Sequence, residues 1–195
     1  IKAAIHFKVK NFILISTDKA VRPSSVMGAT KRITELIAQG LSKQQNEFNS
    51  EQEFNTKFAI VRFGNVLGSS GSVIPLFKKQ IENGGPITIT HPEVSRYFMT
   101  ISEASQLVIQ AGSIGGACNV FILNMGNPVS ILSLAKQMIF LSGNQLKSAE
   151  NSKSKLGIEI KFIGLQKGEK IHEELFIGKN ILPTVHPKIM KAQED

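Results

Sequence analysis

The stretch Phe12-Ile13-Leu14-Ile15-Ser16-Thr17-Asp18-Lys19 runs four apolar residues directly into four polar ones. A short, continuous apolar run of this kind is typical of a strand that is buried on both faces of a parallel sheet. Open α/β sheets bind their ligands at the carboxyl ends of such strands. The stretch therefore predicts a buried strand with a functional site at its polar end.

The rest of the chain alternates between strand-like and helix-like segments. Strands are expected over 12–15, 58–61, 87–90, 120–123 and 158–163. Helices are expected over 27–41, 74–81, 102–109, 132–138 with Ser130 as the cap, and 169–176; in the first, Ile33, Leu36, Ile37 and Leu41 have helical spacing. Residues 43–57 are polar and are expected to form a surface loop or a frayed helix end. Strands that alternate with helices indicate an α/β fold with parallel strands.

Composition narrows the class of protein. The chain has 195 residues, 42% of them hydrophobic, and a formal net charge of +8, which is enough apolar material for one domain of ordinary size. The single cysteine, Cys118, excludes an internal disulfide framework. No apolar run approaches the roughly 20 residues that span a bilayer. Lysine and arginine are scattered, with one Tyr and no Trp, so the charge suits an anionic small molecule or a membrane face better than a nucleic acid.

The polar end of the first strand holds an acid beside a base. Asp18 and Lys19 are adjacent, and a carboxyl next to an amine can donate and accept protons on one substrate. Met27 and Lys31 begin the next helix, where four-residue spacing places them on one face. The simpler alternatives are that Asp18 caps a turn, that Lys19 is solvated and that Met27 fills the core.

A second candidate site is the glycine-rich loop over 64–71, between a predicted strand and a predicted helix. Three interpretations stay open: a cofactor phosphate cradle, a substrate loop, or a plain structural turn. No strand ending in Asp or Glu follows at the distance expected for a ribose ligand. The histidines and Cys118 lack metal-ligand spacing, so neither a structural nor a catalytic metal is expected.

Seven motifs decide between these alternatives. They are STDKAVRP at 16–23, VMGATKR at 26–32, RFGNVLG at 62–68, SVIPLF at 72–77, HPEVSRYFMT at 91–100, GEK at 168–170 and HPK at 186–188. Together they resemble the extended short-chain dehydrogenase/reductase family, and more narrowly the nucleotide-sugar 4,6-dehydratases of bacterial polysaccharide and protein glycosylation. The resemblance covers nearly the whole chain, in the family's order.

The resemblance implies a fold and a division of the chain. The expected fold is the C-terminal half of a doubly wound Rossmann-like parallel sheet plus a smaller α/β substrate-binding domain. Residues 1–72 would belong to the dinucleotide-binding domain with its catalytic motif. Residues 73–195 would form mainly the substrate domain, with segments that return to the Rossmann-like core.

The resemblance also implies a reaction on UDP-N-acetylglucosamine. Hydride leaves sugar C4 for NAD or NADP, water is lost across C5 and C6, and hydride returns to C6. By position, Lys19 would take the C5 proton and Asp18 would protonate the departing C6 hydroxyl. Lys31 and Ser16 would contact the cofactor. Met27 stands where most members have Tyr, so we expect Thr17 to relay the C4 hydroxyl proton, with water or Lys19.

Six further residues match the family's substrate site: Asn65, Val73, Pro75, Phe77, Thr88 and Arg96. Arg96 would lie near the ribose and phosphates, because a guanidinium meets phosphate oxygens bidentately. A surface salt bridge is the alternative for this residue. Gln166 and Lys167 stand where many relatives have an Arg-Pro pair, a departure that weakens the diphosphate clamp.

The same resemblance shapes the expected partners. The chain would be an incomplete fragment that needs a UDP-sugar and an upstream Rossmann half, and it would leave an exposed sheet edge. It would act in the cytoplasm, with any membrane attachment through absent N-terminal segments, and a homo-oligomer stays open. Two rivals remain: a catalytically silent interaction module and a basic nucleic-acid-binding domain.

Overall fold

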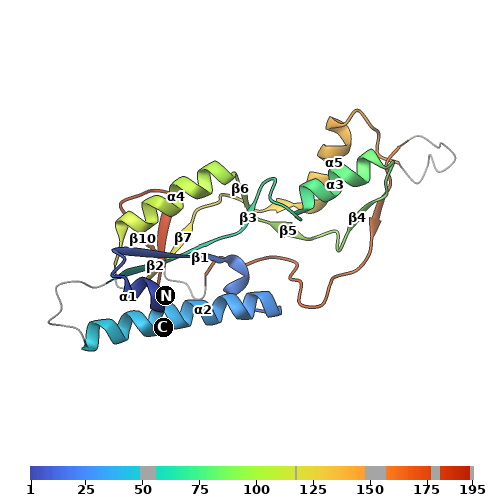
Figure 1. Ribbon diagram of the computed structural model, residues 1–195. Coiled ribbons are helices and arrows are strands. Elements are labelled where there is room, and N and C mark those ends of the chain that lie inside the picture. The colour runs from blue at the N-terminus through green and yellow to red at the C-terminus, as the bar shows by residue number, and fades with distance from the viewer. Residues whose placement is uncertain (49–55, 117, 148–156, 177–180, 194–195) are drawn as a thin grey trace. The chain divides into compact units, whose positions relative to one another are not determined.

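The computed structural model describes residues 1–48, 56–116, 118–147, 157–176 and 181–193 (Figure 1). The chain forms two compact units. Unit 1 comprises Ile1–Gly64, Ser102–Gly126 and Glu174–Asp195, and unit 2 comprises Asn65–Ile101 and Asn127–Glu173. Each unit is therefore assembled from segments that are distant in the sequence.

Unit 1 is built on a five-stranded sheet. Its strands, in spatial order, are β1 (Asn11–Thr17), β2 (Lys57–Phe63), β7 (Asn119–Leu123), β11 (Ile189–Ala192) and β10 (Ile181–Pro183). The first three are parallel, and β11 and β10 extend the sheet in antiparallel fashion. The predicted α/β fold with parallel strands is confirmed, whereas the two antiparallel strands were not predicted.

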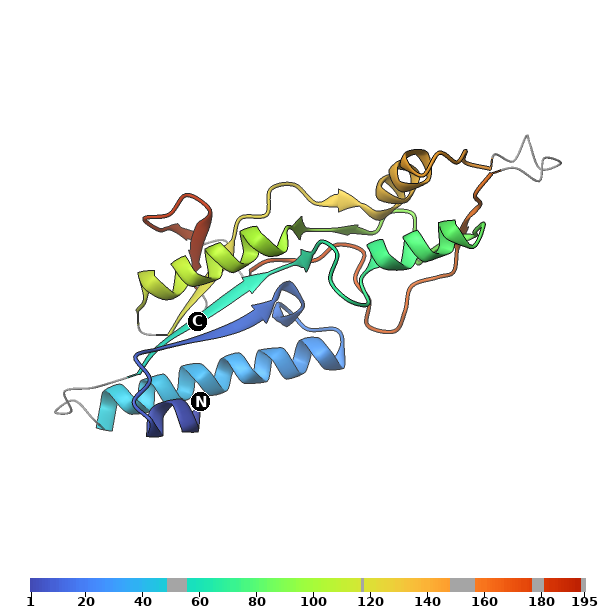
Figure 2. The ribbon, with the colours of Figure 1, turned by 45° about the horizontal axis from the view of Figure 1, so that its top comes forward.

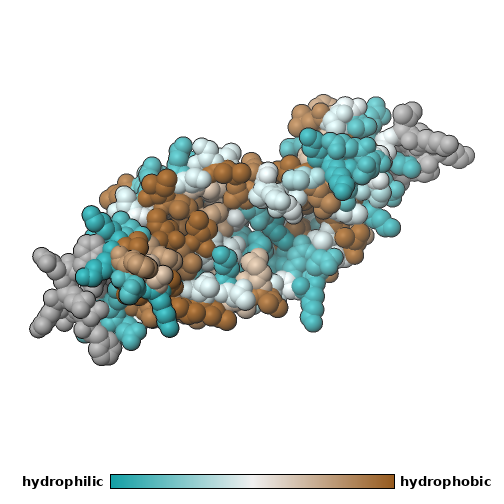
Figure 3. Space-filling view, in the orientation of Figure 1, coloured by the Kyte–Doolittle hydropathy of each residue, from teal (hydrophilic) through white to brown (hydrophobic). Residues whose placement is uncertain are grey.

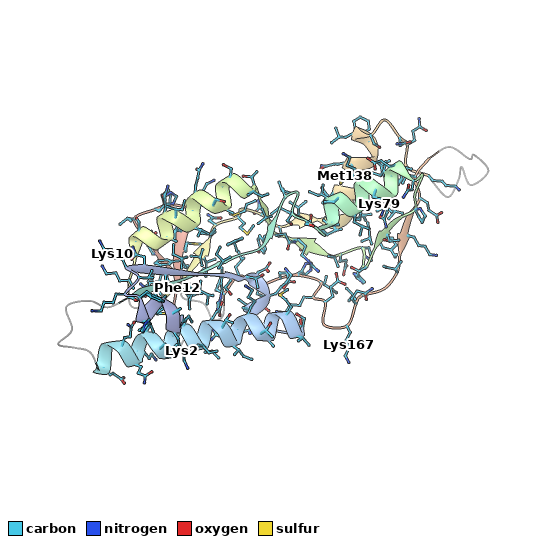
Figure 4. The ribbon with its side chains drawn as sticks, viewed as in Figure 1. Lys2, Lys10, Phe12, Lys79, Met138 and Lys167 are labelled. Carbon is cyan, nitrogen blue, oxygen red and sulfur yellow. The ribbon has the colours of Figure 1, made fainter. Side chains whose placement is uncertain are left out.

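Helices cover both faces of this sheet. Figures 1 and 2 show α1 (Lys2–His6) and α2 (Val26–Phe48) on one face and α4 (Ile101–Ile114) on the other. Phe12 points to the α2 side (Figure 4), and its ring centroid lies 5.6 Å from that of Phe58. On the opposite face α4 packs closely, because a β-carbon on Gly112 would lie 2.2 Å from Cδ1 of Ile13.

Strand β1 is less buried than its sequence predicts. We expected burial on both faces, but β1 is an edge strand of this sheet, and Ile15 is 51% exposed. Figure 3 shows hydrophobic surface over β1 and α4 in unit 1. The expectation of an exposed sheet edge is met at β1, within the part of the chain that the structure describes.

Helix α2 turns a different face to the sheet from the one that its apolar residues indicate. Ile33, Leu36 and Ile37 are each about half exposed. The buried positions are instead Gly28, Glu35, Ala38, Ser42 and Gln45. Small residues allow the helix to approach the strands, and the Glu35 carboxylate finds partners there. The helix also continues past Gly40 to Phe48, so the loop expected over 43–57 begins later, and residues 49–55 lie outside the described ranges.

In the residues that the structure describes, unit 2 consists of three two-stranded sheets and two helices. Parallel pairs are formed by β3 (Asn65–Val66) with β6 (Phe98–Met99) and by β4 (Ile87–Ile89) with β9 (Ile160–Phe162); β5 (Ser95–Arg96) and β8 (Val129–Ser130) are antiparallel. The helices are α3 (Val73–Glu82) and α5 (Ile131–Leu141), which share one hydrophobic core. Ser130 caps α5 as predicted, since its Oγ accepts from Ser133 N at 3.3 Å.

The helix predicted over 169–176 is wrong. The segment is irregular, because Glu169 and Ile171 bond to β5 and not within a helical turn. Ser95 N donates to Ile171 O at 3.1 Å, and Arg96 donates to both Ile171 O and the Glu169 carboxylate. None of the helices in the described ranges combines the length and apolarity needed to cross a membrane.

Candidate functional site

The polar end of β1 bends into a short 3-10 turn, η1 (Asp18–Ala20), that brings together three predicted residues. Thr17 caps this turn, with Lys19 N donating to Thr17 Oγ1 at 3.4 Å. Asp18 Oδ1 accepts from Thr17 Oγ1 at 2.9 Å and from Lys19 Nζ at 3.0 Å. The turn therefore brings the Asp18 carboxylate and the Lys19 amine within hydrogen-bonding distance of each other.

The two carboxylate oxygens of Asp18 have different surroundings. The side chain is fully buried, and Oδ2 has no hydrogen-bond partner among the described residues. The Lys19 side chain is 26% exposed. A buried carboxylate oxygen without a partner is costly, and its cost falls when a donor reaches it. Asp18 Oδ2 is thus an acceptor prepared for a group that these residues do not supply.

The first turns of α2 carry the other two predicted catalytic residues. Lys31 Nζ donates to the backbone oxygen of Ile15 at 3.2 Å, which ties this helix to the end of β1. Met27 lies one turn earlier and is 50% exposed, so it does not fill the core. Lys31 thus lies beside the polar end of β1.

Ser16 belongs to a buried ion cluster that the sequence did not reveal. Its Oγ donates to Glu35 Oε1 at 2.5 Å, and Arg62 donates to the same carboxylate from Nε at 2.7 Å and from its terminal nitrogen at 2.6 Å. Arg32 adds a fourth bond at 2.9 Å. Burial alone would raise the pKa of Glu35, but the bonds and charge of Arg62, with Ser16 and Arg32, hold it below its ordinary value. The available signal was the position of Glu35, four residues after Lys31.

The structure places Arg96 in an ion pair within unit 2. Its guanidinium donates to Glu169 Oε1 at 3.0 Å and to the backbone oxygens of Ser95 and Ile171 at 2.8 and 3.0 Å. Thr90 Oγ1 donates to the same Glu169 oxygen at 2.9 Å. Arg96 therefore holds segment 169–171 to β5. The ion pair considered as its alternative is present, but it is largely buried and not on the surface, since the Arg96 side chain is only 10% exposed.

The other predicted substrate residues also lie in unit 2. Asn65 begins β3, and its backbone N–H donates to the backbone oxygen of Tyr97 at 2.9 Å. Phe77 is buried in the core, with Val73 packed against that core, while Pro75 is exposed in the first turn of α3. Thr88 is bound to α3, since its Oγ1 accepts from Gln80 Nε2 at 2.7 Å. The structure thus gathers Val73, Phe77 and Thr88 around α3.

The glycine-rich loop over 64–71 forms a connection between a strand and a helix, as expected. Gly68 and Gly71 have φ values of +75° and +73°, which glycine adopts without strain. A β-carbon on either residue would meet nothing within 4 Å, so the backbone conformation, and not lack of space, favours glycine at these two positions. In the described ranges, no group of three or more His, Cys, Asp or Glu residues is arranged to hold a metal ion.

A known protein family matches almost the entire chain. A family described as polysaccharide biosynthesis protein matches residues 1–194. The capsular polysaccharide biosynthesis protein CapD of Staphylococcus aureus is 54% identical over 96% of this chain and 29% of its own length. The UDP-glucose 4-epimerase of Rickettsia rickettsii is 37% identical over 90% of this chain and 46% of its own length. The chain therefore spans from about a third to a half of these relatives.

Solved structures agree on the fold. The X-ray structure of Pen from Bacillus thuringiensis is 38% identical with a TM-score of 0.72, covering 89% of this chain and 49% of that one. DesIV of Streptomyces venezuelae, a dTDP-glucose 4,6-dehydratase with NAD bound, shares the fold at a TM-score of 0.68 and 16% identity, over 89% and 53% of the two chains. Sequence motifs, parallel sheet and family match agree: the chain belongs to the polysaccharide biosynthesis protein family of extended short-chain dehydrogenases/reductases.

Proposed function

We propose that this chain carries the acid, the base and part of the substrate site of a UDP-N-acetylglucosamine 4,6-dehydratase in polysaccharide or glycan biosynthesis. The product would be a UDP-4-keto-6-deoxy-N-acetylhexosamine. The observation that carries the proposal is the turn at the end of β1, where the buried Asp18 carboxylate lies 3.0 Å from Lys19 Nζ. Loss of water across C5 and C6 requires one base and one acid, and this pair supplies both.

The Asp18–Lys19 contact accounts for the protons of dehydration. Transfer of one proton from Lys19 Nζ to Asp18 gives a free amine and a carboxylic acid in a single step. Lys19 then takes the C5 proton, and Asp18 gives its proton to the departing C6 oxygen, which leaves as water. The pair ends as ammonium and carboxylate, its starting state, so the two residues can turn over without an outside acid or base.

The first and last steps of the reaction exchange the remaining protons. The C4 hydroxyl loses a proton when C4 is oxidised, and C5 regains one when C6 is reduced, so the two protons balance. Thr17 is suited to the first transfer because its Oγ1 already donates to Asp18 Oδ1 at 2.9 Å. A hydroxyl in such a bond can receive a proton on one side and release one on the other. The Met27 thioether lacks a proton to exchange.

The residues present fit the nicotinamide end of a dinucleotide. Lys31 provides an ammonium donor beside the carboxyl end of β1, where open α/β sheets bind ligands. The unpartnered Oδ2 of Asp18 marks the same end of the strand as a place where a further group is accommodated. NAD or NADP, when bound, supplies reversible hydride transfer. NAD is supported by DesIV, whose structure contains it. Ser16 would contribute through its backbone, since its hydroxyl is bound to Glu35.

For the substrate, we infer that unit 2 binds the UDP portion. Asn65, Val73, Pro75, Phe77, Thr88 and Arg96 match the family's substrate segments. Arg96 would either reach the phosphates after exchanging its Glu169 bond, or hold the 169–171 segment in place for them. The upstream Rossmann half would be a partner of this chain, in the cytoplasm, and a homo-oligomer is compatible with this assignment.

The test is product analysis with the natural protein, including any sequence that flanks this chain. Incubation with UDP-N-acetylglucosamine and NAD or NADP should give a 4-keto sugar nucleotide whose mass is lower by one water. Asp18→Asn and Lys19→Met should each abolish water loss, because they remove the acid and the base. Absence of the keto product from the wild-type protein, with either cofactor bound, would refute the assignment.

A nucleotide-sugar 4-epimerase is the second candidate, supported by the 37% identity with the Rickettsia rickettsii UDP-glucose 4-epimerase. Epimerisation needs only reversible oxidation at C4, and its product has the mass of the substrate. The Asp18–Lys19 pair would then have no reaction to perform at C5 and C6. An isomer of unchanged mass, formed equally well by Asp18→Asn, would favour the epimerase.

A further inference from the structure

The buried ion cluster of unit 1, formed by Ser16, Arg32, Glu35 and Arg62, joins three elements at one carboxylate. Ser16 is the penultimate residue of β1, and Arg62 holds the same position in β2. The two are register partners across the parallel pair. Glu35, from α2, binds both of them. Its side chain and that of Arg62 are completely buried. One carboxylate thus fixes the helix against two adjacent strands near their carboxyl ends.

A hydrogen bond from Lys31 attaches α2 to the end of β1 beside the cluster. Lys31 Nζ binds the backbone oxygen of Ile15, and Glu35 binds the hydroxyl of the next residue, Ser16. Lys31 and Glu35 are four residues apart and therefore lie on one face of the helix. Thr17 follows Ser16 directly. A shift of α2 along or around its axis would break both attachments and move Lys31 away from the turn that holds Asp18 and Lys19.

Stability alone is a weak reason for such a cluster. Buried ion pairs gain little over apolar side chains of similar volume, because desolvation offsets their attraction. Their best-attested use is to fix one register among several. Helix α2 needs such a device, because its buried face has few large apolar side chains to define its position: Gly28, Ala38 and Ser42 are small.

We propose that Glu35 is a positioning residue for catalysis, acting through Ser16. Its carboxylate sets the position of Lys31 on α2 relative to the Thr17–Asp18–Lys19 turn on β1. Glu35 is fully buried and acts only through the residues it binds. This inference rests on the proposed function for its kinetic consequence, but its structural consequence can be measured without substrate.

The informative variant is Ser16→Ala, which removes the bond from the strand and leaves the Glu35–Arg62 pair intact. Glu35→Gln is less informative alone, because it takes the Glu35 carboxylate away from the buried Arg62 guanidinium and can unfold the protein. Ser42→Ala is the matched control: Ser42 is also buried, at 6% exposure, and lies on α2 toward its C-terminal end. Ser42→Ala also removes one buried hydroxyl, but at a distance from the Thr17–Asp18–Lys19 turn.

Both variants are made in the natural protein with its flanking sequence. We expect Ser16→Ala to lower kcat about tenfold or more, with KM for the UDP-sugar within about twofold, since a small misplacement of catalytic groups is costly. Ser42→Ala should keep the wild-type kcat. Wild-type kcat in Ser16→Ala, or an equal fall in both variants, would overturn the proposal. A Kd for NAD that weakens in Ser16→Ala while the amide exchange of α2 stays unchanged would also overturn it and make Ser16 a cofactor ligand.

Hydrogen–deuterium exchange of the protein without substrate separates this inference from the assigned reaction. Ser16→Ala should speed amide exchange at least severalfold in the segment from Thr17 to Lys31, whereas Ser42→Ala should leave that segment unchanged. This result would stand even if the wild-type protein gave no keto product. Unchanged exchange in Ser16→Ala would show that the cluster does not position α2, whatever the reaction.

Discussion

Gly28 lies against the backbone carbonyl of Lys19, so closely that a β-carbon on Gly28 would come within 2.3 Å of that oxygen. Helix α2 therefore begins in direct contact with the turn that holds Asp18 and Lys19. Backbone atoms cannot move aside as the end of a flexible side chain can. Any residue other than glycine at this position must push the helix and the turn apart.

We predict that Gly28→Ala lowers dehydration activity by about a hundredfold, because it displaces Lys31 and Met27 from the turn. Gly40→Ala is the control in the same helix. Its added β-carbon would meet nothing within 4 Å, so alanine should stabilise the protein by about 0.5–1 kcal/mol. Urea unfolding and product assays on both variants test this. Full activity in Gly28→Ala would show that the contact has no role in catalysis.

The hydroxyl of Thr17 is expected to be needed for C4 oxidation. Thr17→Val removes the hydroxyl while keeping the shape, and should slow formation of the reduced cofactor by about a hundredfold or more in a single turnover. Met27→Tyr introduces a phenol on α2 and should restore part of this rate in the Thr17→Val background. The control is Thr34→Val, an exposed position whose hydroxyl bonds only within α2, to Lys31 O. Oxidation at the wild-type rate in Thr17→Val would rule out the relay.

A strained residue, Arg22, follows the turn that holds Asp18 and Lys19. Arg22 has a φ of +41°, a left-handed conformation that costs most L-residues roughly 1–2 kcal/mol and that Asn tolerates better. Its side chain pairs with Glu174 at 2.9 Å, but both are exposed, and such pairs contribute little. Arg22→Asn should therefore raise the free energy of unfolding by about 0.5–1 kcal/mol.

A second variant distinguishes the contribution of the Arg22–Glu174 ion pair to stability from that of the strained Arg22 backbone. Glu174→Gln removes the pair and keeps the conformation of Arg22, so it should change stability by no more than about 0.5 kcal/mol. The double variant with Arg22→Asn should retain the gain. A loss of stability in Arg22→Asn that equals the loss in Glu174→Gln would mean that the pair, and not the backbone, decides the effect.

Local signals in the sequence predicted the parts of the site that neighbours in the chain create. The apolar run into Ser16-Thr17-Asp18-Lys19 predicted both β1 and its polar end, and the helix beginning near Met27 follows within ten residues. The bonds between Thr17, Asp18 and Lys19 need only the turn itself. Such contacts follow from adjacent residues, so they could be predicted without the rest of the fold.

Contacts between distant segments decided what could not be predicted. Apolar spacing favoured Ile33, Leu36 and Ile37 as the buried face of α2, but Glu35 is buried because Arg62, 27 positions further on, meets it. The predicted helix over 169–176 failed because Arg96 binds Glu169 across 73 positions. Strand β11 depends on pairing with β7, and the sequence of β11 alone does not show that partner.

The lowered pKa of Glu35 predicts how stability changes with pH. A carboxyl whose folded pKa lies below its unfolded value contributes stability that is fully present above the unfolded pKa, near 4.5, and is lost as pH falls through the folded pKa. Glu35→Gln removes this contribution at neutral pH, where we expect a loss of about 3–5 kcal/mol because the buried Arg62 guanidinium loses the Glu35 carboxylate.

The difference between wild type and Glu35→Gln should therefore shrink as pH falls below 4.5, because a neutral group then faces Arg62 in both proteins. Urea unfolding across the acidic range measures this. Glu103→Gln is the control, since Glu103 pairs with Lys188 on the surface and should change stability little at any pH. A difference between wild type and Glu35→Gln that stays constant with pH would contradict the prediction.

The single cysteine offers a probe of opening in unit 1. Cys118 is buried just before β7, and burial raises the pKa of its thiol from 9.0 to about 11. This rise of the thiol pKa lowers the thiolate fraction about a hundredfold near pH 8, and the thiolate is the form that reacts. Limited access slows the reaction further. A disulfide reagent should therefore label the folded protein at least about a hundredfold more slowly than the protein in urea.

Because unfolding restores the ordinary pKa of the Cys118 thiol, the labelling rate should rise through the same urea range in which fluorescence or circular dichroism reports unfolding. Rapid labelling of the folded protein would mean that the β7 end of the sheet opens on its own.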